Sequence, residues 1–317
     1  MQNNDVILEV RDLRKEFPVK KRKLYAVSGV SFDVRRGETL GLVGESGCGK
    51  STIAKMVAGS LPVTSGSIKL NGVDYTKLKP REIRPLRRNI QMVFQDPLSS
   101  FSPRMKIGTY ICEPRINYDK VSRDTAMKEA EALLEKVGLP AEFTDRFPHE
   151  LSGGQLQRVA IARAIAIDPK VLICDEATGA LDVSIQNQIA KLLVQLVEEK
   201  GIGCLFIGHD LAFVRSVTQR IAIMYLGRIV ELAPSDLIYD RALHPYTRAL
   251  ISAIPIPDPA LSRERKLLSG DIPSPTQKIE GCPFKTRCPE AGEKCMREAP
   301  VLKEYEPGHF VSCHLYG

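Results

Sequence analysis

One glycine-rich segment constrains the fold of this 317-residue chain more than any other feature. It reads Gly44-Glu45-Ser46-Gly47-Cys48-Gly49-Lys50-Ser51-Thr52 and matches the Walker A pattern. A short apolar run at 39–43 precedes it, and a helix is expected from about Lys50, so the order is buried strand, phosphate loop and helix. Glycines let backbone N–H groups converge on phosphate oxygens, and the helix N-terminus adds favourable partial charge. We expect Lys50 to reach the β- and γ-phosphates of a nucleotide and Ser51 to bind Mg²⁺.

A second apolar run, at 171–174, ends in two consecutive carboxylates, Asp175 and Glu176. This is the Walker B arrangement, in which Asp175 would hold Mg²⁺ directly or through water. Glu176 stands one residue farther along, where a carboxylate can polarise the attacking water. We therefore predict that Glu176 is the general base. The alternative is an ordinary acidic strand end.

The pattern along the chain predicts an α/β fold. Apolar and polar residues alternate at 7–10 and 30–34, as in half-buried antiparallel strands, and 68–72 reads as a further strand with a turn. Residues 121–137 have helical periodicity and end before Gly138, and strand and helix alternate again from Val171. We expect a P-loop NTPase (RecA-like) core that carries a small antiparallel β subdomain and a helical insertion at about 97–160.

A change of composition predicts two parts. Prolines stand at 234, 245, 255, 257, 259, 273 and 275 and break the chain into short pieces. We expect a nucleotide-binding domain at 1–235 and a C-terminal extension at 236–317.

Composition narrows the class of protein. A hydrophobic content of 43% suffices for a real core. No stretch approaches the roughly 18 apolar residues that span a bilayer, and the N-terminus lacks a signal pattern, so a cytoplasmic protein is expected. The net charge of +7 comes partly from basic runs at 20–23 and 77–88. Solvated loops explain such runs most simply, and a permease or anionic lipid surface is the alternative. Nucleic acid is not expected as a partner, because no aromatics interleave the basic residues.

The segment Leu151-Ser152-Gly153-Gly154-Gln155 is the signature of the ATP-binding-cassette (ABC) family, which this sequence resembles from about 6 to 231. The resemblance implies ATP-driven transport. In that family the signature serine and glycines cap the γ-phosphate of ATP held by the opposite subunit, again at a helix N-terminus. It implies that Ser152 works in trans, that a dimer closes around two ATP molecules, and that hydrolysis reopens it.

The resemblance assigns three further polar residues. Gln95 matches the Q-loop, whose amide contacts Mg²⁺ and water. His209 matches the switch histidine that positions the γ-phosphate and the base, and Asp182 lies in the D-loop, which crosses between subunits. Ala177 and Gly179 depart from the residues common in the family, and neither departure touches the two carboxylates. Leu156 replaces the Arg that is common after the signature, so we expect less positive charge near the phosphates.

Adenine needs an aromatic partner upstream of the phosphate loop, because the base binds by its π-face. Phe17 holds the position that is usual in the family, but the insertion at 18–24 brings Tyr25 into contention. Either ring could instead belong to the core.

Three segments of the extension, at 244–250, 270–275 and 281–288, resemble oligopeptide and dipeptide permease ATPases. The resemblance implies a heterodimer with a paralogous ATPase, two integral-membrane permease subunits and an extracytoplasmic substrate-binding protein. It places the chain peripherally at the cytoplasmic face of the inner membrane. Peptides are the expected substrate, with nickel or other metal chelates and glutathione as alternatives. A soluble ABC ATPase acting on ribosomes or DNA is the rival class, but it fits poorly because only one signature occurs and 98 residues separate Thr52 from Leu151.

Four of the eight cysteines crowd the end of the chain, namely Cys282, Cys288, Cys295 and Cys313. Their gaps of 5, 6 and 17 residues lack the tight pair that structural zinc sites usually include. Such permease ATPases are known to bind a [4Fe–4S] cluster, so the resemblance favours a cluster over zinc or unligated thiols. A metal-stapled C-terminal extension is therefore expected, because the segment is too small to form its own core.

Overall fold

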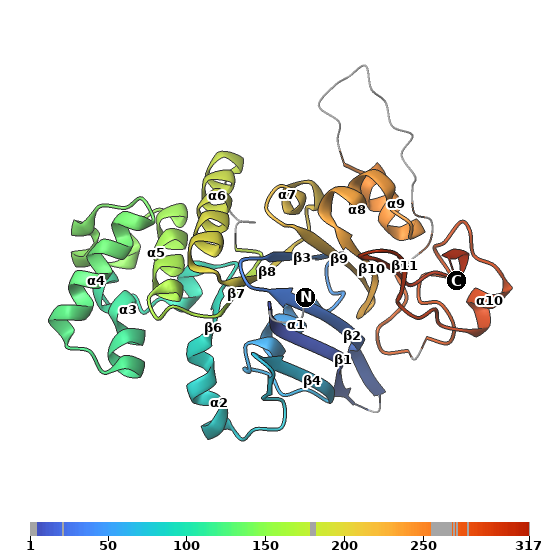
Figure 1. Ribbon diagram of the computed structural model, residues 1–317, viewed down its shortest axis with the longest axis horizontal. Helices are drawn as coiled ribbons and strands as arrows, with labels where there is room; N and C mark the ends of the chain where they lie inside the picture. The colour runs from blue at the N-terminus through green and yellow to red at the C-terminus, as the bar shows by residue number, and fades with distance from the viewer. Residues whose placement is uncertain are drawn as a thin grey trace, which may run out of the picture.

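The computed structural model describes residues 5–20, 22–177, 182–254, 268, 270, 272–277 and 279–316. Two sheets organise the chain (Figure 1). The larger has eight strands in the order β11-β12-β10-β9-β3-β8-β7-β6, and the smaller has four in the order β2-β1-β4-β5. The fold is the predicted α/β arrangement with a separate antiparallel sheet.

The centre of the large sheet is parallel and buried. It contains β6 (Ile90–Val93), β7 (Val171–Asp175), β8 (Gly203–Gly208), β3 (Thr39–Gly44) and β9 (Arg220–Tyr225). Every residue of β3 and β8 is buried, which explains why both read as continuous apolar runs. Since the carboxyl ends of parallel strands share one edge, the residues that follow β3, β7 and β8 are brought together there.

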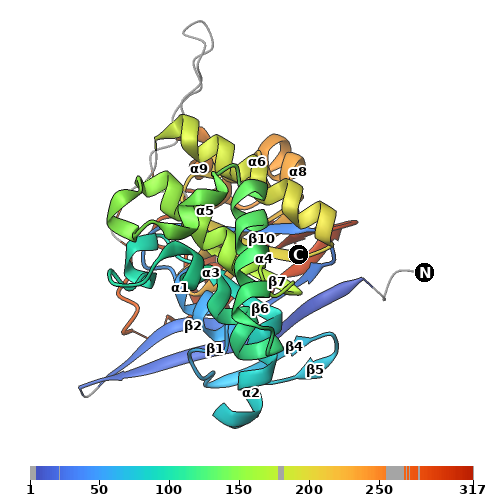
Figure 2. The same ribbon diagram turned by 90° about the vertical axis from the view of Figure 1, so that its left-hand side faces the viewer.

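The small sheet is built on a long hairpin of β1 (Val6–Val19) and β2 (Arg22–Arg35), to which β4 (Ser65–Leu70) and β5 (Val73–Asp74) are added. Its alternating apolar residues share a core with the helix α1 (Lys50–Val57). The predicted antiparallel subdomain and the predicted helix after the phosphate loop are both present. Figure 2 shows this sheet in the lower part of the molecule, next to α2.

The helical insertion lies at one end of the molecule, in green in Figure 1. It contains α3 (Ile107–Pro114), α4 (Arg123–Lys136) and α5 (Gly153–Ile165), after α2 (Pro80–Leu86). α4 buries an i, i+4, i+8 stripe of Ala126, Ala130 and Leu134, and Ser122 caps its first turn by accepting from the Thr125 N–H at 3.2 Å. The helix predicted at 121–137 is therefore correct.

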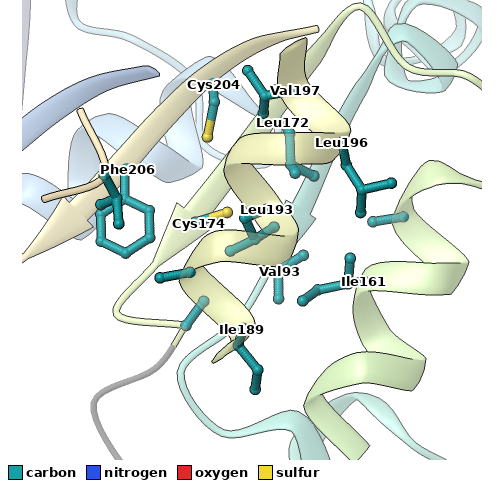
Figure 3. Packing of buried hydrophobic residues seen from close by; sticks show 14 of the residues in the cluster. Val93, Ile161, Leu172, Cys174, Ile189, Leu193, Leu196, Val197, Cys204 and Phe206 are labelled. Carbon is teal, nitrogen blue, oxygen red and sulfur yellow. The ribbon is translucent and has the colours of Figure 1, made fainter. Parts of the chain in front are cut away.

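One apolar core joins the elements that carry the predicted motifs (Figure 3). α6 (Val183–Lys200) covers β7 and β8 with Ile189, Leu193 and Val197. Val93 of β6 and Ile161 of α5 belong to the same cluster. The insertion is therefore packed directly onto the core around β6 and β7.

The C-terminal extension is joined to the cassette rather than attached by a linker alone. It contains α8 (Ser235–Arg241), α9 (Pro245–Ser252), α10 (Glu293–Arg297), β11 (Lys303–Glu306) and β12 (His309–Val311). β12 pairs antiparallel with β10 (Arg228–Pro234), which extends the large sheet by two strands. The α7 helix (Leu211–Arg215) completes the cassette. No helix in the described ranges is long and apolar enough to cross a membrane.

A fully buried carboxylate stabilises this junction. Glu231 of β10 accepts hydrogen bonds from the Leu243 N–H at 2.7 Å and the His244 N–H at 3.0 Å, and it pairs with His309 Nε2 at 2.8 Å. Nearby, the rings of Tyr225, Tyr246 and Phe284 form an aromatic cluster with centroids 4.9 to 5.5 Å apart. A strand pair, a buried polar network and packed rings therefore fasten the extension to the cassette.

Candidate nucleotide site

The phosphate loop follows β3 and begins α1, as predicted. Gly49 has φ +107°, and a Cβ at this position would collide with the carbonyl oxygen of Ala26. A Cβ at Gly44 would collide with the carbonyl oxygen of Met224. The loop can therefore pack against both neighbouring segments only with glycine at these two positions.

Lys50 is almost fully buried at the start of α1. Its Nζ donates to the carbonyl oxygens of Gly44 at 2.7 Å and Glu45 at 3.1 Å. The loop thus holds the ammonium group against its own backbone, next to the N–H groups that a polyphosphate would need. This position fits the predicted contact with β- and γ-phosphates.

Ser51 and Asp175 come together across a sequence separation of 124 residues, with Ser51 Oγ donating to Asp175 Oδ1 at 3.1 Å. Burial raises the pKa of the Asp175 carboxyl, and the hydrogen bond from Ser51 partly offsets this effect. A hydroxyl and a carboxylate at this spacing are the hard oxygen ligands that Mg²⁺ prefers. The residues present therefore fit a Mg²⁺ ion beside the phosphate loop.

Glu176 and His209 also converge. The Glu176 carboxylate lies 3.9 Å from His209 Nδ1, and the imidazole follows β8 with its side chain 64% exposed. Glu176 has φ +49° and its N–H donates to the Ile207 carbonyl at 3.0 Å. A left-handed backbone costs a residue other than glycine roughly 1–3 kcal/mol and clusters at functional sites. The conformation supports a role for Glu176 beyond packing.

The signature segment forms the start of α5. Ser152 Oγ accepts from the Gln155 N–H at 3.3 Å, while Gln155 Oε1 accepts from the Ser152 N–H at 2.9 Å, a reciprocal capping box. Gly154 packs closely on α6, because a Cβ there would lie 2.8 Å from Ile185 Cγ2. Ser152 and Gly153 are exposed, so the N-terminus of α5 is open to a ligand.

The residues of the predicted Q-loop and D-loop lie at the ends of β6 and α6. Gln95 is exposed after β6, and the neighbouring Phe94 carbonyl accepts from the buried Gln157 Nε2 of α5 at 3.4 Å. This contact links the predicted Q-loop to the signature helix. Asp182 is the N-cap residue that directly precedes α6, whereas Gly179 and the other residues at 178–181 lie outside the described part of the chain.

The two candidates for adenine stacking occupy different surroundings. The Phe17 ring lies under Lys15 Nζ, 4.9 Å from its centroid. Tyr25 lines a cavity of about 400 Å³ with Arg14 and Arg228, and its N–H donates to the Pro275 carbonyl of the extension at 2.9 Å. The choice between the two rings stays a prediction.

Sequence reasoning missed two residues of the extension that contact the phosphate loop. Arg287 forms two hydrogen bonds with the Glu45 carboxylate, at 2.9 and 3.1 Å, and Tyr246 Oη accepts from the Glu45 N–H at 3.2 Å. Both residues lie in segments that marked the family resemblance. Their separations from Glu45, 242 and 201 residues, leave no local pattern that could have revealed the contacts.

Comparison with known proteins decides the family. Residues 27–179 match the family described as ABC transporter, and residues 230–295 match the oligopeptide/dipeptide transporter C-terminal region. The chain is 48% identical to the oligopeptide transport ATP-binding protein OppF of Salmonella typhimurium, over 99% of this chain and 97% of the relative. It is also 48% identical to the putative oligopeptide transport ATP-binding protein YkfD of Bacillus subtilis, over 98% and 95%. The chain belongs to the ABC transporter ATPases.

Solved structures agree with this assignment. A dimeric post-hydrolysis state of the ATP-binding cassette MJ0796, bound to ADP and Pi, is 28% identical with a TM-score of 0.67, over 72% of this chain and 99% of that one. The structure of cbiO1 from Clostridium perfringens, described as part of the ABC transporter complex cbiONQ, is 30% identical with a TM-score of 0.67, over 75% of this chain and 92% of that one. The predicted family and ATP-hydrolysing activity are confirmed.

The metal predicted in the extension of this ABC ATPase requires a correction. Cys282, Cys288, Cys295 and Cys313 do line one cavity of about 230 Å³. Across the described residues, however, no group of three or more His, Cys, Asp or Glu side chains could hold a metal ion. Burial raises the pKa of the Cys282 thiol to about 11 and also raises those of Cys288 and Cys313, which favours the thiol over the thiolate that metals require. The predicted [4Fe–4S] cluster is therefore wrong, and the zinc alternative is not supported. In the described residues, the pairing of β12 with β10, the polar network around Glu231 and the packed aromatic rings fasten the extension.

Proposed function

We propose that this chain is the ATP-hydrolysing subunit of a bacterial ABC importer for oligopeptides or dipeptides. The observation that carries the proposal is the near full-length identity of 48% to an oligopeptide transport ATP-binding protein, which includes the transporter-specific C-terminal region. Soluble relatives that act on ribosomes or DNA would not explain that region. Peptide import is thus favoured over the metal-chelate and glutathione alternatives.

The site supports the following roles for its residues. Lys50 and the backbone N–H groups of the phosphate loop would bind the β- and γ-phosphates of ATP. Ser51 and Asp175 would hold Mg²⁺, which, when bound, neutralises part of the phosphate charge. Gln95 would approach the same site from the end of β6. These assignments rest on the contact between Ser51 and Asp175 and on the buried position of Lys50.

Glu176 would accept a proton from the attacking water. The water oxygen would bond to the γ-phosphorus while the bond between that phosphorus and the β–γ bridging oxygen breaks. ADP leaves with the bridging oxygen. His209, 3.9 Å from the Glu176 carboxylate, would orient the base and the γ-phosphate. The strained backbone of Glu176 supports this role, because it positions a carboxylate directly after a buried strand.

Ser152 would complete the site of a second ATPase rather than its own. The exposed start of α5 offers unpaired N–H groups and favourable partial charge to a γ-phosphate. The dimeric state of the related cassette MJ0796 supports a dimer here. We infer a paralogous partner, with Asp182 near the shared interface, so that closure would bury two ATP molecules.

A groove of about 720 Å³ offers a place for the permease. It runs between α2 and the helical insertion and is lined by Arg84, Arg87, Tyr118, Lys120 and Arg163, among others. Positive side chains around an aromatic ring suit an acidic, partly apolar segment at the cytoplasmic end of a membrane subunit. The chain would then lie peripherally at the cytoplasmic face of the inner membrane. The extracytoplasmic substrate-binding protein would act only through the permease.

Glu176→Gln tests the mechanism. This variant should still bind ATP, and hydrolysis should fall by roughly 10²- to 10⁴-fold, because the amide cannot take the proton. Glu135→Gln, on the exposed side of α4, is a matched control that should hydrolyse ATP normally. Unchanged hydrolysis in Glu176→Gln would exclude this residue as the base.

Uptake tests the substrate. The chain would be reconstituted with its permease subunits and binding protein in proteoliposomes, and ATP-dependent accumulation of labelled peptides, nickel chelates and glutathione would be compared. Peptide uptake that stops in Glu176→Gln supports the proposal. Uptake of chelates or glutathione alone would refute it.

A further inference from the structure

The phosphate loop contains a carboxylate, that of Glu45, whose negative charge opposes the binding of phosphate. Glu45 directly follows Gly44, and its backbone carbonyl is one of the two that hold Lys50 Nζ, at 3.1 Å. ATP brings several negative charges to this loop. An unpaired Glu45 carboxylate would repel them and would compete with them for the Lys50 ammonium group. The loop therefore needs a cation that neutralises Glu45.

The C-terminal extension supplies that cation. The Arg287 guanidinium meets both oxygens of Glu45 in a bidentate pair, at 2.9 and 3.1 Å, and approaches Tyr225 Oη at 3.5 Å. The Arg287 side chain is 8% exposed and that of Glu45 26%. These hydrogen bonds to Glu45 outweigh burial and raise the pKa of Arg287, so its guanidinium stays charged.

A second contact from the extension holds the backbone at the same residue. The Glu45 N–H donates to Tyr246 Oη, and Tyr246 is completely buried against Tyr225 and Phe284. Burial raises the pKa of the Tyr246 phenol, which keeps it neutral. The extension thus orients both the side chain and the backbone of the second residue of the loop.

We propose that Arg287 is a positioning residue for ATP binding: it neutralises Glu45 and keeps that carboxylate away from Lys50 and the phosphates. The extension is in this respect part of the nucleotide site. The inference rests on the proposed function, since it assumes that the phosphate loop binds ATP. It assigns Arg287 no contact with ATP.

A double-mutant cycle tests the charge relation. ATP would be titrated calorimetrically into the full-length chain carrying Glu176→Gln, in which hydrolysis is slow. The same titration would be repeated with Arg287→Met, with Glu45→Gln and with both together. Arg287→Met should raise the Kd for ATP by about tenfold, the scale of one uncompensated charge at a partly exposed site. The same change should have little effect once Glu45→Gln has removed the carboxylate. Arg248→Met is the matched control, because Arg248 pairs with Glu290 inside the extension, at 3.2 Å.

The outcomes separate the possible roles of Arg287. An unchanged Kd in Arg287→Met would overturn the proposal, and so would an equal loss with and without Glu45, which would indicate structural support alone. If Arg287→Met does not fold, Arg287→Lys enters the same cycle. It keeps the charge but not the fork geometry, so a smaller increase in Kd that disappears with Glu45→Gln is expected. Failure of ATP to bind even the Glu176→Gln chain would instead refute the proposed function.

Discussion

Removing the Glu231 carboxylate should weaken the attachment of the extension to the cassette. Glu231 is fully buried in β10 and accepts from two backbone N–H groups, those of Leu243 and His244, besides its contact with His309. In Glu231→Ala both N–H groups lose their acceptor, and an unsatisfied buried donor costs about 1–3 kcal/mol. Burial lowers the pKa of His309, but its contacts with Glu231 and Glu306 outweigh burial and raise it, so His309 can lose a proton once Glu231 is removed. The expected loss in the free energy of unfolding is therefore about 2–6 kcal/mol.

Glu231→Gln separates the hydrogen bonds from the lost volume. Glutamine retains one acceptor oxygen, so it can satisfy one N–H group while its amide N–H₂ faces the other. One unpaired donor corresponds to about 1–3 kcal/mol. The order wild type, Glu231→Gln, Glu231→Ala is therefore expected for decreasing stability.

Urea unfolding followed by circular dichroism would measure both variants. Glu306→Gln serves as the control, because Glu306 contacts the same His309 from a more exposed position, at 3.2 Å, and should cost about 1 kcal/mol or less. If Glu231→Ala were as stable as Glu306→Gln, the assignment of Glu231 as the polar centre of the junction would be wrong.

Three further predictions concern acid sensitivity, the phosphate loop and a buried ion pair. Burial lowers the pKa of His244 to about 4, below its unfolded value of about 6.5. The folded chain therefore keeps its full stability above about pH 6.5 and loses part of it as the pH falls towards 4, because the unfolded chain takes up the proton first. The loss is about 3 kcal/mol, and His244→Asn, which can still accept from the Tyr246 N–H, should flatten this part of a stability–pH curve. Gly49→Ala places a methyl group against the Ala26 carbonyl at φ +107° and should abolish ATP binding in a titration, whereas Ser60→Ala, after α1, should not. Arg220 pairs with the buried Glu38 at 2.5 Å, so Arg220→Met leaves this carboxylate without a counter-charge. The free energy of unfolding measured in urea should fall by about 3–5 kcal/mol. A loss below about 1 kcal/mol would contradict that account.

Much of the fold was readable from the chain because its signals are local. The strand before Gly44, the phosphate loop and the helix after it are contiguous, and so are β7 and its two carboxylates. Strand alternation and the i, i+4 stripe of α4 likewise depend on neighbours a few residues apart. Because parallel strands end at one edge of the sheet, even the meeting of Ser51 with Asp175 could be anticipated.

The extension shows where such reading fails. Four cysteines near the end of the chain predicted a metal, yet their side chains form no group that could hold one. Spacing along the chain does not determine how thiols point when loops fold. In the part of the chain that the structure describes, β12 and the network around Glu231 fasten the extension to the cassette. Neither feature has a contiguous signal in the sequence.

By itself, the sequence determined the ATPase family, the cassette fold and the residue types around the phosphates, since each depends on short segments with a fixed local geometry. Only the tertiary structure decided which distant residues complete that site. Arg287 reaches Glu45 across 242 residues because Tyr246 and Phe284 of the extension pack against Tyr225 of the cassette. Such contacts depend on how buried surfaces fit together, and that fit is a property of the folded chain.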